Sequence, residues 1–176
     1  TRPAPCSTLG ACSALTRAGI FAAVSSDGTN RVMTSPDGIT WTARSAASAA
    51  TWVKVIYADG QFVAITDQGI TNAVMTSPDG ITWTGHSVPL GAWFGLTYGN
   101  GTYVAVSYNA NRVMTSPDGI TWTARSAVGD NDLWSGVTYG NGTFVAVGES
   151  GDYVMTSPDG ITWTGRTQAE SNTWWY

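Results

Sequence analysis

Four aspartates recur in the same local sequence, Ser-Pro-Asp-Gly, and are the first candidates for acid–base or metal chemistry: Asp37, Asp79, Asp118 and Asp159. An aspartate between proline and glycine also suits a tight turn, where its carboxylate accepts hydrogen bonds from nearby backbone N–H groups. Because each aspartate belongs to a separate repeat, we expect the four to lie far apart and to hold turns. We therefore expect no metal site, no cofactor and no catalytic residue among them.

A second recurring feature is a cationic side chain shortly after each of these turns. Further arginines or a tyrosine occur where the variable loop before each turn leads into the next strand. The residues at these two kinds of position are Arg44, His86, Arg125, Arg166, Arg31, Arg112 and Tyr153. Grouped on one face, such side chains would suit a carbohydrate or an anionic glycan. These seven are our candidate ligand-binding residues.

The elements that must position these residues come from an internal repeat. The stretch Val-Met-Thr-Ser-Pro-Asp-Gly-Ile-Thr-Trp-Thr occurs four times unchanged, at 32–42, 74–84, 113–123 and 154–164. Two sets of aromatic markers each keep a spacing of 41 residues: Trp52, Trp93, Trp134 and Trp175, and Phe21, Phe62, Tyr103 and Phe144. A repeat of this length is typical of propellers, solenoids and similar arrays.

Each repeat divides into four short strands, here called a to d, most clearly in the fourth unit. We expect strand a at Leu133–Tyr139 and strand b at Thr143–Val147, joined by an Asn-Gly hairpin turn. A variable loop leads to strand c at Tyr153–Thr156, and the Ser-Pro-Asp-Gly turn leads to strand d at Ile161–Arg166. Four such strands predict an antiparallel meander.

Four meanders in sequence predict an all-β fold, a β-propeller of four-stranded antiparallel blades. The expected blades cover about 11–51, 52–92, 93–133 and 134–172, after an irregular segment at 1–10. Residues 173–176 would start a fifth blade or close the ring. An unclosed propeller leaves an edge strand and an apolar blade face, so we also expect self-association through open blade edges.

The tryptophans recur at two positions in the repeat. We expect Trp41, Trp83, Trp122 and Trp163 on strand d to fill the gaps between blades, because large flat side chains bury the most area there. The second set, at the start of strand a, would lie nearer the central channel. For these, core packing is favoured over stacking on sugar rings.

The Ser-Pro-Asp-Gly-Ile-Thr-Trp segments resemble the Asp-box, or bacterial neuraminidase repeat, of sialidase-like proteins. In that pattern, Ser-x-Asp-x-Gly-x-Thr-Trp, the turn joins the third and fourth strands of a propeller blade. Ser35, Asp37, Gly38, Thr40 and Trp41 match it, as do their counterparts in the other three repeats. This chain has one residue fewer between Asp and Gly, so we expect a tighter turn. The resemblance implies the fold and leaves activity open, because the Asp-box occurs in enzymes and non-enzymes alike.

The residues that glycoside or acyl-transfer chemistry would need are scarce. Sialidase chemistry, as the resemblance implies, needs an arginine cluster, a tyrosine–glutamate pair and an acid/base aspartate. The only glutamates are Glu149 and Glu170, both in variable loops, and His86 is the only histidine. A paired-carboxylate glycosidase or a nucleophilic triad is therefore poorly supported. We expect that the chain is not an enzyme.

Composition limits the partners of this chain. The net charge of −4 and the pI near 4.6 argue against nucleic acid. No apolar run is long enough for membrane insertion. Low charge, a single lysine and many threonines and tryptophans favour an extracellular or surface-displayed protein. Cys6 and Cys12 form either a local disulfide or two free thiols.

The repeats differ mainly in their b–c loops and d–a connections, which should emerge on one face of the disc. Binding residues tend to lie on variable loops of a rigid scaffold, although drift in exposed loops explains such variation equally well. Our leading hypothesis is a binding module that recognises glycan or protein through this face. The rivals are a structural module of a surface or phage-type assembly, and a fragment of a sialidase-like glycoside hydrolase.

Overall fold

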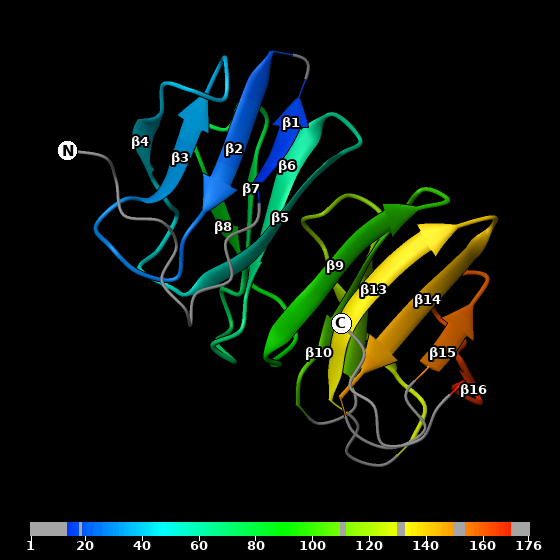
Figure 1. Ribbon diagram of the computed structural model, residues 1–176. Coiled ribbons are helices and arrows are strands. Elements are labelled where there is room, and N and C mark those ends of the chain that lie inside the picture. The colour runs from blue at the N-terminus through cyan, green and yellow to red at the C-terminus, as the bar shows by residue number, and fades with distance from the viewer. Residues whose placement is uncertain (1–13, 18, 110–111, 130–132, 150–153, 170–176) are drawn as a thin grey trace.

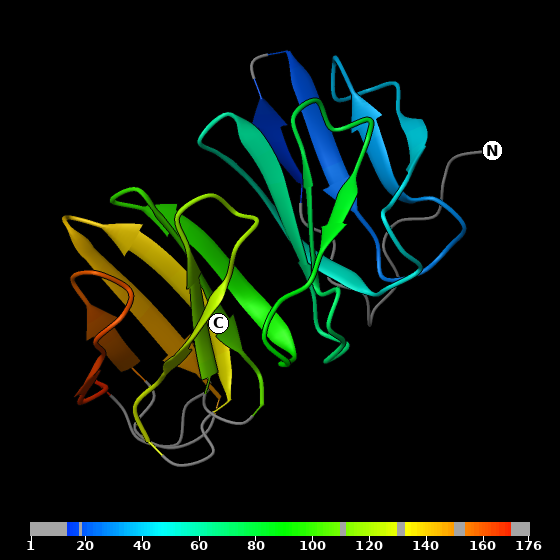
Figure 2. The ribbon, with the colours of Figure 1, turned by 180° about the vertical axis from the view of Figure 1, so that it is seen from behind.

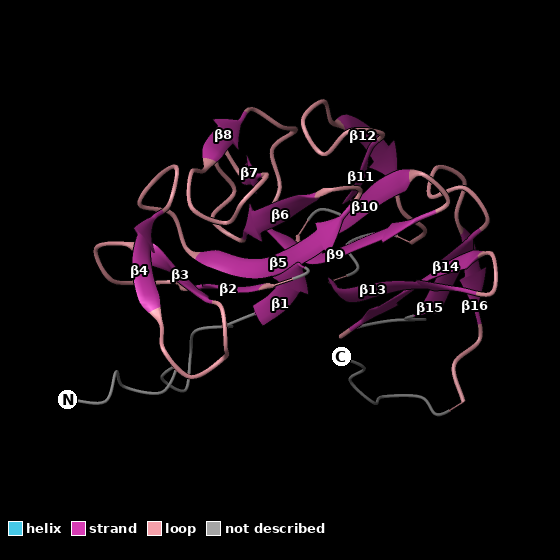
Figure 3. Ribbon diagram, turned by 90° about the horizontal axis from the view of Figure 1, so that it is seen from above, coloured by secondary structure: helices cyan, strands magenta, loops and turns pink. Residues whose placement is uncertain are grey.

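The computed structural model describes residues 14–17, 19–109, 112–129, 133–149 and 154–169. In these residues sixteen strands form four four-stranded antiparallel sheets, each in chain order, and there is no helix. The prediction of an all-β propeller of four-stranded blades is confirmed. The inner strands β1, β5, β9 and β13 follow one another along an open arc, and β4, β8, β12 and β16 lie outermost (Figure 3).

Four consecutive strands form each blade. The first two blades contain β1 (Ala14–Arg17), β2 (Ile20–Val24), β3 (Arg31–Ser35), β4 (Thr42–Ser45), β5 (Trp52–Ala58), β6 (Gln61–Thr66), β7 (Val74–Ser77) and β8 (Thr84–His86). The last two contain β9 (Trp93–Gly99), β10 (Thr102–Ser107), β11 (Arg112–Ser116), β12 (Thr123–Ser126), β13 (Trp134–Gly140), β14 (Thr143–Gly148), β15 (Val154–Ser157) and β16 (Thr164–Arg166). Figures 1 and 2 show the blades from opposite sides.

The outermost strand is shorter than its sequence predicts. In the fourth blade strand d was expected from Ile161, but β16 begins at Thr164. The reason is local, because the Asp159 carboxylate accepts hydrogen bonds from the backbone N–H groups of Ile161 and Thr162 at 2.8 and 2.9 Å. Those donors are held in the turn, and the Ile-Thr-Trp segment belongs to the turn rather than to the strand.

A β-bulge opens strand a in the second, third and fourth blades. In the third blade Trp93 pairs with Ser107 while Gly95 pairs with Val106, which leaves Phe94 as the extra residue. Val53 and Ser135 take the same place in the neighbouring blades. A bulge shifts the alternation of side chains by one residue. Trp93 and Leu96, three residues apart, therefore pack in the same core cluster.

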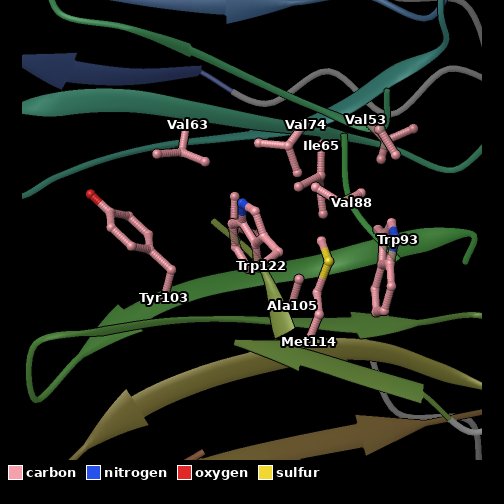
Figure 4. Close-up of a cluster of buried hydrophobic side chains, with 12 residues drawn as sticks. Val53, Val63, Ile65, Val74, Val88, Trp93, Tyr103, Ala105, Met114 and Trp122 are labelled. Carbon is pink, nitrogen blue, oxygen red and sulfur yellow. The ribbon is translucent and has the colours of Figure 1, made fainter. Parts of the chain in front are cut away.

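The hydrophobic core consists of clusters between successive blades. Each blade has a forward face, turned to the following blade, and a backward face, turned to the preceding one. Between the second and third blades, the forward face supplies residues such as Val63, Ile65 and Val74, and the backward face supplies Trp93 and Met114 (Figure 4). The same pattern recurs at the other two junctions. Packing between blades thus replaces a single central core.

Candidate functional site

The variable segments lie together at one end of the sheets. Backbone hydrogen bonds join each described d–a connection to a b–c loop or to the residue that begins one, as in Val88 N–H to Thr71 O at 2.7 Å and Tyr108 N–H to Ala92 O at 2.8 Å. We call this end the loop face. The opposite end, which carries the a–b hairpins and the Ser-Pro-Asp-Gly turns, is the turn face. Variation between blades is therefore concentrated on the loop face.

On the turn face, each repeated aspartate is held within its own turn. The Oδ1 atom of Asp118 accepts hydrogen bonds from Ile120 N–H, Thr121 N–H and Ser116 Oγ at 2.8, 2.7 and 2.9 Å. The serine also accepts a bond from Gly119 N–H, and this glycine has a φ of 72°. The bonds from Thr121 and Ile120 lower the pKa of Asp118 from 3.8 to about 2. The other three turns repeat this geometry.

The four aspartates lie in four different blades. Among the described residues, no group of three or more His, Cys, Asp or Glu side chains could hold a metal ion.

The repeated cations lie within the outermost strands and point along the forward face of each blade. The Nε of Arg44, Arg125 and Arg166 donates to the hydroxyl of Thr34, Thr115 and Thr156, at 3.0, 3.0 and 2.8 Å. His86 Nε2 makes the equivalent contact with Thr76 at 2.7 Å. Burial lowers the pKa of His86, while Asp118 of the next blade opposes that shift. These four residues are therefore tied to their own blades and do not converge.

The loop cations are also engaged by the fold. Arg31 Nη1 donates to the carbonyls of Ser26 and Ala50, both at 2.7 Å. Arg112 donates to the carbonyl of Leu90 in a different d–a connection. Tyr153, the seventh candidate, lies outside the described residues, as do Cys6 and Cys12. The structure does not assemble the candidate cations into one anion-binding site.

A different set of side chains stands where strand b enters its loop. This position, directly after β6, β10 and β14, carries Asp67, Tyr108 and Glu149 in successive blades. All three are half-buried. Thr51 Oγ1 donates a hydrogen bond to the Asp67 carboxylate, and the Tyr108 hydroxyl donates one to the Glu149 carboxylate of the neighbouring blade. One position of the repeat therefore presents a carboxylate in the second and fourth blades and a phenol in the third, at the same edge of the loop face.

The bulge of the third blade adds an aromatic ring to this edge. The rings of Phe94 and Tyr108 lie with their centroids 5.7 Å apart, at an interplanar angle of 42°. We name Phe94, Tyr108 and Glu149 the rim cluster. It offers two aromatic faces beside a carboxylate, an arrangement that suits a cationic or amphipathic side chain of a ligand. The bulge residues of the second and fourth blades, Val53 and Ser135, offer no such ring.

Sequence reasoning missed the rim cluster, because it treated Glu149 only as a residue of a variable loop. A signal was present: Asp67, Tyr108 and Glu149 stand at one position of the repeat, and they are the residues there that fail to repeat.

The tryptophans at the start of strand a are packed inside the fold. Trp52, Trp93 and Trp134 are 0%, 0% and 1% exposed, and they lie in the core clusters between blades. Their position excludes them as a platform for sugar rings. Trp175 lies outside the described residues.

Comparison with known proteins identifies the class of fold. No family model and no curated protein sequence matches this chain. Among solved structures, it resembles a virginiamycin B lyase from Staphylococcus aureus with a TM-score of 0.79 at 14% identity, over 93% of this chain and 57% of that one. A streptogramin B lyase gives 0.78 at 9%, over 93% and 55%. YCF48 bound to D1 peptide gives 0.62 at 16%, over 86% and 50%.

These likenesses show the fold alone, that of a β-propeller-like repeat protein, and the chain spans about half the length of each neighbour. They support a propeller fold but not membership of the Asp-box family. The resemblance to the Asp-box therefore rests on the turn sequence alone.

The expectation that this chain is not an enzyme is corrected by the same comparison. Two of these neighbours are lyases, so a fold of this shape carries catalysis in other proteins. The scarcity of sialidase or glycosidase residues argued against those particular chemistries, and it was wrong to extend that argument to enzymes in general.

Among the described residues, no helix is long and apolar enough to cross a membrane.

Proposed function

We propose that this chain is a binding module whose loop face takes up an extended peptide segment of a partner protein, with a lysine or arginine of that segment at the rim cluster. The observation that carries the proposal is the contact of the Tyr108 hydroxyl with the Glu149 carboxylate beside the Phe94 ring. Aromatic faces attract a cationic head group, and a neighbouring carboxylate adds an ion pair.

Electrostatics favours a basic segment over an anionic glycan. The chain carries 12 acidic and 8 basic residues, and Asp67 and Glu149 stand at the same position of the second and fourth blades. The arginines expected to hold an anionic glycan donate hydrogen bonds to carbonyls or threonines of the fold. YCF48, a solved structure of similar fold, is bound to a peptide, which adds support by analogy of fold only.

The test measures binding to two arrays, one of peptides that differ in their number of Lys and Arg residues, the other of glycans. We expect binding to basic peptides and a decrease as salt concentration rises. Glu149→Gln removes the charge of the rim cluster and should weaken binding about tenfold, the effect of roughly 1.4 kcal/mol. Tyr108→Ala should weaken it at least as much, because it removes both the ring and the hydroxyl.

The matched control is Asp59→Asn. Asp59 occupies the a–b hairpin on the turn face with a φ of 47°, and Asn100 and Asn141 stand at the same place with φ of 47° and 50°. The substitution therefore removes the same charge without straining the turn, and binding should be unchanged. Binding to glycans or acidic peptides alone would contradict the proposal. Binding to neither array would favour the rival role of a structural scaffold.

Extracellular or surface display remains a prediction from composition. The rim cluster would serve a secreted protein and an internal one equally well, so the proposed binding does not depend on it.

A further inference from the structure

The two outer faces of this four-blade arc match the halves of an interface that the chain already builds three times. At each internal junction, valine or isoleucine side chains of a forward face meet the tryptophans, aromatic ring and methionine of a backward face. Figure 4 shows this for the junction between the second and third blades. Among the described residues, no blade precedes the backward face of the first blade, and none follows the forward face of the fourth. Each carries the residue types of the repeat.

The backward face of the first blade exposes residues that are buried in the other blades. Phe21, Met33 and Trp41 are half-buried. Their counterparts in the second blade, Phe62, Met75 and Trp83, are 0%, 0% and 8% exposed. Ile39 of the same face is 83% exposed, whereas its counterparts are 43 to 46% exposed. Among the described residues, no blade packs on this cluster of large apolar side chains, which is why they remain exposed.

The forward face of the fourth blade shows the complementary change. Val145, Val147 and Val154 are half-buried, and their counterparts in the third blade are completely buried: Val104, Val106 and Val113. Thr156 is half-buried as well, while the equivalent Thr115 is 4% exposed. The outer face of the first blade therefore lacks a forward face to pack against, and the outer face of the fourth blade lacks a backward face.

The turn glycines show how closely the two halves fit. A Cβ built on Gly160 would lie 2.7 Å from Val104 Cγ2 and 3.6 Å from Thr115 Cγ2 of the preceding blade. One built on Gly38 meets only Phe21 of its own blade. The counterparts of Val104 and Thr115 are Val145 and Thr156, both on the outer face of the fourth blade. A blade seated there would place its turn glycine under these two side chains.

Charge matches in the same way. Within the chain, the carboxylate of Asp118 on the next blade interacts electrostatically with His86 on a forward face and acts to raise the pKa of His86. Arg44 and Arg125, at the place of His86, are half-buried, whereas Arg166 on the outer face of the fourth blade is exposed. The outer face of the first blade presents Asp37 at the place of Asp118. A head-to-tail junction would bring Arg166 and Asp37 together.

We propose that the fourth blade of one copy of this chain packs its forward face on the backward face of the first blade of a second copy, and that two such junctions close two copies into one ring. The chain spans 50 to 57% of the neighbours of similar fold, so two copies supply about the length of one such protein. A heterologous contact forms a closed ring only when the rotation closes, and otherwise gives open polymers. This inference does not depend on the proposed ligand.

The first measurement is the mass of the 176-residue chain in solution by sedimentation velocity across a range of concentrations. We expect twice the single-chain mass of 18.5 kDa. Val145→Asp alters only the forward outer face, and Met33→Asp alters only the backward one. Either variant alone should sediment as a single chain with an unchanged far-UV spectrum, because a desolvated charge in the junction is unfavourable.

Mixing the two variants makes the test independent of folding. One junction of the mixed pair then joins two unaltered faces, so a two-chain species should reappear, which two unfolded variants could not form. Asn141→Asp is the matched control, because it adds the same charge to the fourth blade at a hairpin where Asp59 occurs naturally. It should remain a two-chain assembly.

A single-chain mass at every concentration would overturn the proposal. It would leave the outer faces to another occupant, such as segments of this chain outside the described residues. Variants that fail to recover a two-chain species on mixing would overturn the head-to-tail geometry. Masses that grow without limit would overturn closure by two copies.

Discussion

Gly99 and Tyr139 touch across the junction between the third and fourth blades, with the tyrosine ring lying over the glycine Cα. A Cβ on Gly99 would lie 2.1 Å from Cγ and 2.3 Å from Cδ1 of that ring. Gly99 ends β9 and Tyr139 is the next-to-last residue of β13, so this contact sets how closely the two inner strands approach (Figure 1). The absence of a side chain at this position is what permits the approach.

Gly99→Ala should therefore destabilise the fold by about 1–3 kcal/mol, the usual cost of overpacking a fitted contact. Urea denaturation followed by tryptophan fluorescence measures the change. Gly140 ends β13 at the same place in the next blade, and a Cβ there meets nothing within 4 Å. In a single chain, the state expected of the Val145→Asp variant, Gly140→Ala should change stability by less than about 0.5 kcal/mol. Equal effects of the two substitutions would refute the steric explanation.

Tyr103 stands where the other blades carry phenylalanine, and its hydroxyl donates to Ala58 O of the preceding blade at 2.7 Å. Tyr103→Phe should cost about 1 kcal/mol at neutral pH through loss of this bond. Burial raises the pKa of Tyr103 to about 12, so the unfolded chain ionises first, and stability should fall as pH rises from about 10 to 12. Denaturation curves at pH 9 and 11 should show that Tyr103→Phe loses less stability between these pH values than the unaltered chain does.

The aspartate turns should govern stability in acid. Their pKa values are lowered by backbone hydrogen bonds, in Asp118 to about 2. Their contribution is complete above pH 4 and is lost as pH falls through these values. Circular dichroism should detect this loss between about pH 4 and pH 2. Asp118→Asn keeps an acceptor oxygen, so at pH 7 it should be less destabilising than Asp118→Ala, and the reverse order would argue against the turn role.

His86 should make stability depend on pH near neutrality. Burial lowers its pKa below 6.5 in the folded state, although Asp118 opposes the shift. The contribution of His86 to stability is therefore complete above pH 6.5. It decreases as pH falls, because the unfolded state then binds a proton more readily than the folded state. His86→Arg should remove this dependence, because Arg44 and Arg125 make the equivalent threonine bond in their blades. Urea midpoints at pH 5 and 7.5 test it, since His86 is the only histidine.

Much of each blade could be predicted because its chemistry is local. In the turn from Ser116 to Trp122, the bonds of the Ser116 and Asp118 side chains stay within seven residues, while Gln61 of the preceding blade is a distant donor to Asp118 O. The Asn141–Gly142 hairpin needs only two residues that accept positive φ. Strand d was predicted too long for a local reason as well. The aspartate carboxylate holds the two N–H groups that the strand would have used.

The sequence by itself determined the repeat, the meander of strands and the all-β class, since these follow from patterns within one unit of about 41 residues. Only the tertiary structure decided which residues meet between units. The bulge at Phe94, which no residue type announces, turns that ring toward Tyr108, and Glu149 reaches Tyr108 from 41 residues away. Likewise the repeated cations look like a binding set in sequence but lie against their own blades, because packing between blades decides where each side chain points.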